Sequence, residues 1–139
     1  MFCGEYLHTL DSKNRLTLPS RLRELLGDHV VLTRSVDPCL SLYPFPVWQE
    51  YAARLDALPQ TETRQIRRFL FSSAQELDVD GQGRLLIPAP LCEYAGLSKH
   101  VRVVGVGEHA EIWDEERWLA EQSDENTAAL ADTLIKLGF

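Results

Sequence analysis

"LDSKNRLTLPSRLREL", residues 10–25, is the stretch from which the fold of this 139-residue chain can be deduced, because it occurs twice. Residues 79–94, "VDGQGRLLIPAPLCEY", repeat its skeleton at an offset of 69 positions. The shared pattern is D-x-x-x-R-L-x-[LI]-P-x-x-L-x-E-x-x-G, in which Asp11 matches Asp80 and Arg15 matches Arg84. Chance similarity would hardly preserve Asp, Arg, Pro and Gly together, so we expect two structural repeats.

Each copy is predicted to form a strand, a tight turn, a second strand and a short helix. "YLHTLD" and "QELDVD" alternate apolar and polar residues, as strands with one buried face do. Asn14 and Gly83 occupy equivalent places in the turns, and these two residue types best tolerate a positive φ. "RLTLP" and "RLLIP" then predict strands that end at proline. After Pro19 we expect a short helix with Ser20 as its N-cap and Gly27 as its end.

The repetition continues beyond the motif. After a one-residue slip, "LSLYPFPVW" (40–48) matches "AEIWDEERW" (110–118). Apolar residues at helical spacing predict helices over 46–59 and 63–75 between the copies, and over 114–122 and about 126–137 after the second. We therefore expect an α+β, β-rich protein whose repeats share one core. Its predicted parts are a first repeat over 1–60, a connecting helix within 61–76 and a second repeat over 77–139.

The net charge of −7 is unevenly distributed. Residues 1–72 carry nine Lys and Arg against eight Asp and Glu, a net of +1, whereas residues 73–139 carry five against thirteen, a net of −8. Salt screens charges beyond about 10 Å, so the local charge decides which partner a surface attracts. The acidic total therefore does not exclude nucleic acid as a partner of the first half.

Four basic residues follow one another around the first copy of the motif. Lys13 and Arg15 are predicted at a hairpin tip, and Arg21 and Arg23 on the short helix after it. A projecting basic ribbon of this kind can enter the DNA major groove, where arginine makes bidentate contacts to guanine. Backbone N–H groups at the tip and at the helix start can add phosphate contacts.

In the second copy only Arg15 has a basic counterpart, Arg84. This difference favours a role in packing for the second copy. In both copies the aspartate, Asp11 or Asp80, is expected to organise the turn together with Asn14 or Gly83. It would do so through an ion pair with the arginine or through bonds to backbone N–H groups.

Patterns typical of enzymes are missing from the chain. The four histidines lack the spacing of metal ligands, and no serine lies in a G-x-S-x-G context. Cys3, Cys39 and Cys92 are widely spaced, which argues against a disulfide framework and a zinc site. We expect no catalytic residue, cofactor, metal, small-molecule substrate or membrane span. The arginines at 64, 67 and 68 are compatible with a solvated helix face, a subunit contact or a phosphate contact.

Three segments, "MFCGEYLHTLDSKNRLTLPSRLRE", "DVDGQGRLLIPAPLCEYAGL" and "EIWDEERW", resemble the MraZ family of bacterial regulators. That family is related to AbrB-type swapped-hairpin DNA-binding domains. The resemblance implies a pseudo-dimer of two AbrB-like repeats (a swapped-hairpin, double-psi-type barrel) with peripheral helices, assembled as a closed homo-oligomeric ring. It also implies a cytoplasmic, nucleoid-associated repressor that binds tandem promoter repeats in double-stranded DNA upstream of the division and cell-wall gene cluster.

Carried over by motif, Lys13 and Arg15 would contact DNA and Asp11 would organise the turn. Two positions depart from the family pattern: Cys3 stands where "MFRG" has arginine, and Asn14 where "KGR" has glycine. The loss of the arginine puts the DNA affinity in question.

An alternative from another class is an oligomeric assembly protein whose arginines mediate subunit contacts and which acts through protein partners. A DNA-binding antitoxin is less expected, because antitoxins of this fold usually carry one motif and a disordered tail. Substitution of Arg15 distinguishes the repressor from the assembly protein. It would abolish DNA binding in a repressor and oligomerisation in an assembly protein.

Overall fold

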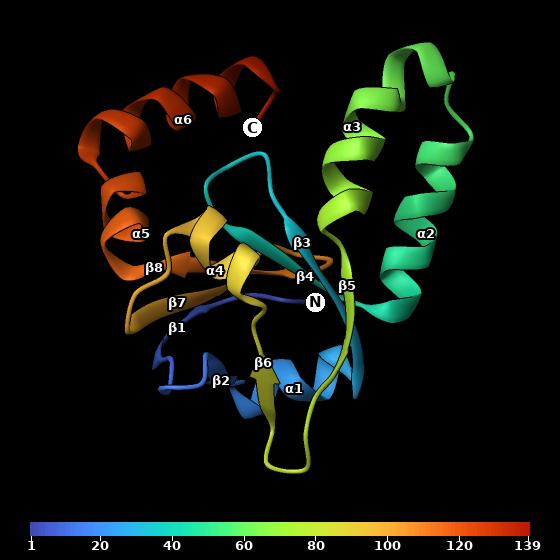
Figure 1. Ribbon diagram of the computed structural model, residues 1–139. Helices are drawn as coiled ribbons and strands as arrows, with labels where there is room; N and C mark the ends of the chain where they lie inside the picture. Colours follow the sequence, from blue (N-terminus) through green and yellow to red (C-terminus); the bar gives the residue numbers. More distant parts are fainter.

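The structure, a computed structural model, describes residues 1–139 and contains eight strands and six helices (Figure 1). The elements are β1 (Glu5–Thr9), β2 (Arg15–Thr17), α1 (Ser20–Leu26), β3 (His29–Arg34), β4 (Leu40–Pro44), α2 (Phe45–Asp56), α3 (Gln60–Ser73), β5 (Gln75–Asp78), β6 (Arg84–Leu86), α4 (Ala89–Ala95), β7 (His100–Gly105), β8 (Ala110–Asp114), α5 (Glu115–Glu121) and α6 (Asp124–Lys136). The order β–β–α–β–β–α–α therefore occurs twice, and the α+β class with two repeats is confirmed.

The strands of the two repeats are interleaved. The larger sheet has the order β1-β7-β8-β4-β3-β5, and β2 and β6 form a separate two-stranded sheet. All neighbouring strands are antiparallel. Thus β1 of the first repeat pairs with β7 of the second, and β5 of the second pairs with β3 of the first. Neither repeat has a complete sheet of its own.

The registers reveal a local two-fold relation between the repeats. In the β2–β6 pair Leu16 lies opposite Leu85, its equivalent in the repeated motif. In the β4–β8 pair Ser41 lies opposite Glu111, its equivalent after the one-residue slip. A residue that pairs with its own equivalent lies on a two-fold axis, as at the interface of a symmetric dimer.

The main core contains 18 buried apolar residues from both repeats. Leu16 and Leu85 are fully buried there, together with Leu22 of α1 and Leu91 of α4. The prediction of one shared core is therefore correct. A smaller cluster around Trp48 and Leu70 holds α2 and α3 against β3 and β4.

The α2–α3 and α5–α6 helices lie toward one end of the molecule, whereas the motif turns and the short helix α1 lie at the other (Figure 1). The α2–α3 pair and the α5–α6 pair occupy the upper end of this view. None of the six helices combines the length and the apolar character that a membrane-spanning helix needs. The prediction of Ser20 as a helix N-cap is wrong. Pro19, with φ −54° and ψ 133°, is the extended residue before α1, and Ser20 is the first helical residue with no capping side-chain bond.

Candidate nucleic-acid interface

The first turn is held together by Asp11. Its Oδ1 accepts hydrogen bonds from the backbone N–H groups of Lys13 (2.9 Å) and Arg15 (2.8 Å). Its Oδ2 accepts a third bond, at 2.7 Å, from Nε of the Arg15 side chain. These bonds, first among them the one from the Arg15 backbone, hold the pKa of the Asp11 carboxyl below its ordinary value. The aspartate therefore fixes both the turn and the arginine beside it.

The second turn repeats this geometry. Asp80 Oδ1 accepts from the backbone N–H groups of Gln82 and Arg84, both at 2.9 Å, and Oδ2 accepts from Arg84 Nε at 2.8 Å. The pKa of Asp80 is lowered for the same reason, chiefly by the bond from the Arg84 backbone. Asn14 and Gly83 have φ angles of 59° and 77°, so the prediction of positive φ at both positions is confirmed.

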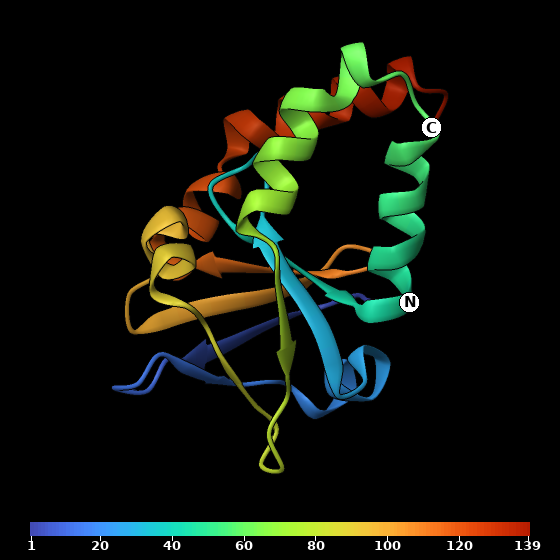
Figure 2. The same cartoon turned by 45° about the vertical axis from the view of Figure 1, so that its right-hand side comes forward.

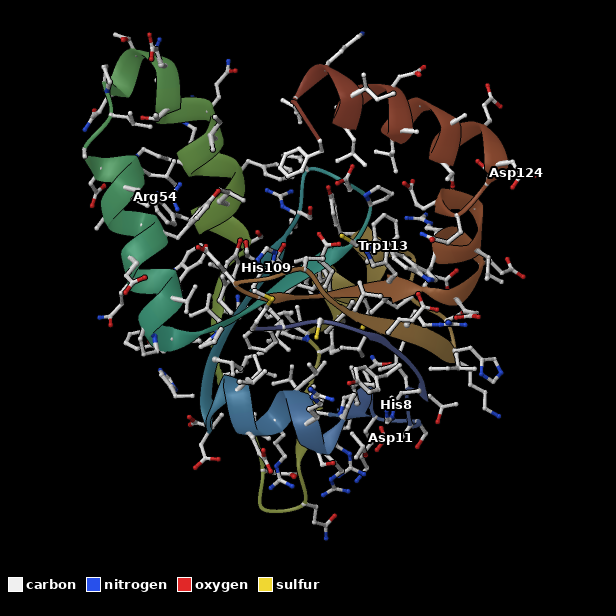
Figure 3. The ribbon with its side chains drawn as sticks, turned by 180° about the vertical axis from the view of Figure 1, so that it is seen from behind. His8, Asp11, Arg54, His109, Trp113 and Asp124 are labelled. Carbon is white, nitrogen blue, oxygen red and sulfur yellow. The ribbon has the colours of Figure 1, made fainter.

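Each turn is also bonded to the opposite repeat. The Asn14 carbonyl accepts from the Ile87 N–H, and the Gly83 carbonyl accepts from the Leu18 N–H, both at 2.9 Å. Each turn therefore extends from the β2–β6 sheet, on the side away from the α2–α3 and α5–α6 helices (Figure 1). In Figure 2 the first turn points to the left and the second downward. Figure 3 shows Asp11 at this end, far from Arg54 of α2 and Asp124 of α6.

Arg15 keeps two donor nitrogens available. Its side chain is 30% exposed, and Nε is its one hydrogen-bonding atom, so Nη1 and Nη2 have no acceptor within the chain. Lys13 is exposed and forms no ion pair. The first turn thus presents the ammonium group of Lys13 and the Nη1 and Nη2 atoms of Arg15, whose guanidinium is held by Asp11 through Nε.

The two remaining predicted DNA contacts, Arg21 and Arg23, differ in their surroundings. Arg21 is exposed on α1. Arg23 instead crosses to the second repeat, where its Nη1 would lie 2.6 Å from a Cβ placed on Gly83. Glycine at this position therefore gives the turn its backbone conformation and makes room for the arginine. The second turn, uncharged in sequence apart from Asp80 and Arg84, receives a second guanidinium from the first repeat.

Lys99 is a basic residue beside the first turn that sequence reasoning missed. It lies just before β7, and its carbonyl accepts from the Leu10 N–H at 2.8 Å. Its side chain is exposed. Lys99 comes to lie there because β1 of the first repeat pairs with β7 of the second. The local sequence pattern does not reveal this exchange of strands, so Lys99 could not be predicted from it.

The arginines of α3 lie away from both turns. Arg67 forms an ion pair with Asp56 of α2 and lies over the Phe71 ring, 5.2 Å from its centroid. Arg64 and Arg68 are exposed and have no carboxylate partner. One of the three arginines thus braces the α2–α3 pair, and the other two remain solvated.

Comparison with known proteins identifies the family. A family model described as "MraZ protein, putative antitoxin-like" matches residues 1–69 and, again, residues 70–137. Proteins named "Transcriptional regulator MraZ" from Desulfitobacterium hafniense (strain DSM 10664 / DCB-2) and Acetivibrio thermocellus are 45% and 44% identical over 143 residues, with 100% of both chains covered. One of the same name from Heliobacterium modesticaldum is 49% identical over 120 residues, 85% of this chain and 84% of the relative.

A solved structure shows a fainter likeness. The solution structure of PHS018 from Pyrococcus horikoshii is 13% identical in sequence and covers 78% of this chain and 95% of that one. Its TM-score of 0.36 is too low to equate the two folds. The resemblance predicted from the repeated motif is confirmed by the family model and by the full-length relatives.

Proposed function

We propose, starting from the fact that this chain belongs to the MraZ family, that it is a sequence-specific DNA-binding regulator of transcription. Two relatives that match the chain over their whole length, at 44–45% identity, are named transcriptional regulators. The proposal places the interface at the two motif turns, with Lys13, Arg15, Arg21 and Arg23 as DNA contacts.

The observation that carries the proposal is the way Asp11 holds Arg15. Because Asp11 Oδ2 accepts the hydrogen bond from Arg15 Nε, the guanidinium is held in one orientation while its Nη1 and Nη2 stay free to donate. Two parallel donors match the O6 and N7 acceptors of guanine in the major groove, a contact worth about 1–3 kcal/mol of discrimination between bases. An arginine already oriented loses less side-chain entropy when it binds.

The interleaved strands support a swapped-hairpin arrangement. The two strands of each motif, β1 with β2 and β5 with β6, pair mainly with strands of the other repeat. We propose that this is the AbrB-like pseudo-dimer, with repeats over 1–60 and 77–139 joined by a helix within 61–76. Its two-fold axis would present two turns with the same backbone frame and different charges to a DNA duplex.

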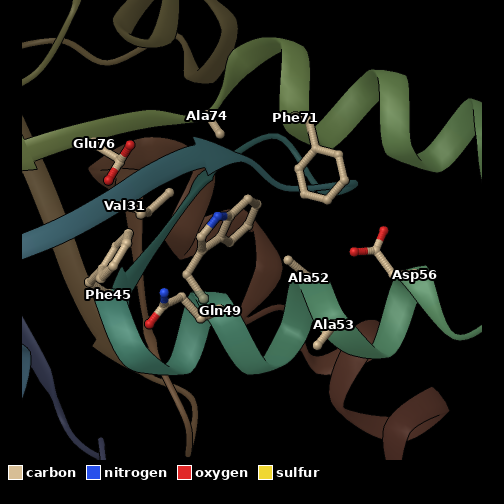
Figure 4. A pocket seen from close by; sticks show the side chains of 10 residues that line it. Val31, Phe45, Gln49, Ala52, Ala53, Asp56, Phe71, Ala74 and Glu76 are labelled. Carbon is tan, nitrogen blue, oxygen red and sulfur yellow. The ribbon is translucent and has the colours of Figure 1, made fainter.

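Two unpartnered apolar features support a homo-oligomer. The whole of α6 is exposed, and Leu130 and Leu134 of this helix and Leu137 directly after it follow one another at helical spacing. A pocket of about 450 Å³ lies between α2 and α3, lined by Phe45, Ala52 and Phe71 with Asp56 and Glu76 among them (Figure 4). We propose that a second copy covers these surfaces in a closed ring.

A ring would suit a promoter with tandem repeats. Several weak contacts made at once gain affinity through effective concentration, without any new contact. As the family resemblance implies, the proposed target is the promoter of the division and cell-wall gene cluster, with repression as its effect. Such a regulator would act in the cytoplasm, on the nucleoid.

The test is DNA binding by the full chain to the region upstream of its own gene, measured by fluorescence anisotropy over a salt series. Wild-type protein should bind with an affinity that falls steeply with salt, because counterions are released from phosphates. Arg15→Ala should weaken binding by about 5- to 150-fold, as expected for the loss of about 1–3 kcal/mol per contact. Arg64→Ala, on the solvated face of α3, is the matched control and should bind like the wild type.

The alternative, an assembly protein that acts through protein partners, draws on the same exposed face of α6. It predicts that Arg15→Ala changes the oligomeric state, measured by light scattering, and that no DNA fragment binds at low salt. Unchanged binding of the promoter by Arg15→Ala would refute the site, and absence of binding at low salt would refute the function.

A further inference from the structure

We propose that a pocket at the end of β3 binds a small organic phosphate, with Arg34 as its charged contact. The pocket has a volume of about 330 Å³ and lies between the end of β3, the end of α3, the start of β5 and the start of α4. Its walls include Arg34, Ser72, Gln75 and Tyr94, with Pro88 and Pro90 on the α4 side. This volume lies in the range of small-molecule sites.

Arg34 is a half-buried cation without a carboxylate partner. Six arginines of the chain are half-buried, and Arg15, Arg67, Arg84 and Arg102 each form an ion pair. The other two are Arg23, which lies at the second motif turn, and Arg34. Removing a charge from water without an opposite charge is costly, so an anion that enters the pocket would gain the interaction that the chain itself does not supply.

Two aromatic rings, one carbonyl group and one hydroxyl group hold the guanidinium in place. Its central carbon lies 4.2 Å from the centroid of the Phe69 ring and 5.5 Å from that of Tyr94. Nη2 donates to the Phe69 carbonyl at 2.9 Å and to Ser72 Oγ at 3.3 Å. The Tyr94 hydroxyl is itself bonded to the Ser35 carbonyl at 2.6 Å, so this wall of the pocket is fixed as well.

Several donors around the pocket have no acceptor. Arg34 Nε is shielded from solvent and has no hydrogen-bond partner, and Nη1 makes no hydrogen bond. The Ser72 hydroxyl accepts from Arg34 but donates to no group, and the Gln75 side-chain amide is not hydrogen-bonded. A ligand oxygen beside the guanidinium would accept from Nη1 and, after a small movement of the side chain, from Nε.

The equivalent place in the second repeat is filled by the chain itself. The register of β7 and β8 against β3 and β4 makes Gly105 the counterpart of Arg34. A Cβ on Gly105 would come within 2.2 Å of the Cys3 backbone nitrogen, because the N-terminal segment packs directly on this glycine. The repeat architecture therefore does not require an arginine here, and the pocket exists once in the molecule.

The position and donors of the pocket favour a small phosphate compound over DNA or a carboxylate. The pocket lies where β3 ends and β5 begins, near the helical end of the molecule and away from both motif turns (Figure 1). Donors from β3, α3 and β5 surround it, which suits a phosphate group because its oxygens point in several directions. The proline side chains and Leu91 offer apolar contact to an organic remainder.

The test is a titration of the ¹⁵N-labelled full chain with glycerol 3-phosphate, inorganic phosphate and acetate, at constant ionic strength set by sodium chloride. Glycerol 3-phosphate should shift the Arg34 Nε–Hε signal and the amide signals of Ser72 and Gln75, and should bind more tightly than the other two. Arg34→Gln should weaken binding by at least about tenfold, the loss expected for a charged hydrogen bond.

Two further variants keep the test decisive if Arg34→Gln perturbs the fold. Ser72→Ala changes an exposed residue and should weaken binding while its unfolding transition stays that of the wild type. Arg64→Gln, on the exposed face of α3, should bind like the wild type. The proposal is overturned if the pocket signals do not move up to tens of millimolar ligand, if Arg34→Gln binds equally well, or if acetate binds more tightly than the phosphates.

Discussion

The two motif turns are alike in every hydrogen bond of their frame and different in the charges they carry. In each, one aspartate accepts from two backbone N–H groups and from the Nε of the arginine four residues on. The arginine side chains are exposed to nearly the same extent, 30% for Arg15 and 29% for Arg84. Between the aspartate and the arginine, however, the first turn has Ser12 and Lys13, whereas the second has Gly81 and Gln82 at the same positions.

This comparison separates what duplication supplies from what one copy adds. The frame serves folding, because both turns extend from a sheet to which each repeat contributes one strand. Under the proposed function the added charge serves DNA binding, because a free ammonium group at a turn has no role in packing. Arg23 qualifies the contrast, since it carries a charge of the first repeat across to the second turn.

The largest expected effect tests whether both frames contribute equally to folding. Leu16 and Leu85 face each other across the β2–β6 pair and are fully buried. Leu16→Ala and Leu85→Ala should each lower the free energy of unfolding by about 2–5 kcal/mol, because each leaves a cavity in the shared core. Urea unfolding followed by circular dichroism measures both.

Leu86→Ala is the matched control for that experiment. Leu86 lies next to Leu85 in the same strand, yet 56% of it is exposed, so its loss should change stability by less than about 0.5 kcal/mol. The double variant Leu16→Ala/Leu85→Ala should deviate from additivity, because the two side chains are neighbours. A much smaller loss for one leucine than for the other would mean that the repeats do not share the core symmetrically.

A smaller effect distinguishes the turns at their positive-φ residues. Gly83→Ala should destabilise the protein by about 1–2 kcal/mol, because an alanine at φ 77° brings its Cβ close to the following carbonyl. The new Cβ also meets the end of the Arg23 side chain, which can move aside. Thermal unfolding should therefore show a clear loss in stability.

Asn14→Gly is the reciprocal change in the first turn. Glycine relieves the backbone at φ 59° but gives the unfolded chain more freedom, so stability should change by less than about 1 kcal/mol in either direction. Equal losses in the two variants would contradict the assignment of φ as the cause and would indicate that side-chain contacts of Asn14 hold the first turn.

The sequence was sufficient for the repeated elements and insufficient for their exchange. The D-x-x-x-R motif, the turn residues Asn14 and Gly83 and the strand–turn–strand–helix order of each copy could be predicted because each rests on local chemistry. The pairing of β1 with β7 and of β5 with β3 could not, because a strand's alternation of apolar and polar residues does not name its partner.

The same limit applies to the candidate site. Lys13, Arg15 and Arg21 could be identified from the local sequence of the first copy, and the structure leaves all three accessible in whole or in part. The position of Arg23 on Gly83 and of Lys99 beside Leu10 depends on contacts between repeats. The N-cap at Pro19 was missed for another reason, because a serine at the start of a helix is a frequent but not obligatory cap.

The smallest expected effect concerns acid. The pKa values of Asp11 and Asp80 are held below their ordinary value of 3.8, first by the backbone N–H of the following arginine in each turn. A carboxyl whose pKa is lower in the folded than in the unfolded state stabilises the fold above the unfolded pKa and loses this contribution as pH falls through the folded one. Wild-type protein should therefore lose stability as pH falls below about 4.

Asp11→Asn and Asp80→Asn should each remove a similar, small part of that loss. An asparagine keeps one oxygen that can accept from the backbone N–H groups, so the turn persists, but it cannot titrate and gives up the charged acceptor of Arg15 or Arg84. Urea unfolding at pH 7 and at about pH 3 should show a shallower pH dependence in each variant and the shallowest in the double variant. Because the frames of the two turns are alike, the changes should be equal, whereas a larger change at Asp11 would mean that Lys13 adds to the stabilisation of the first carboxylate.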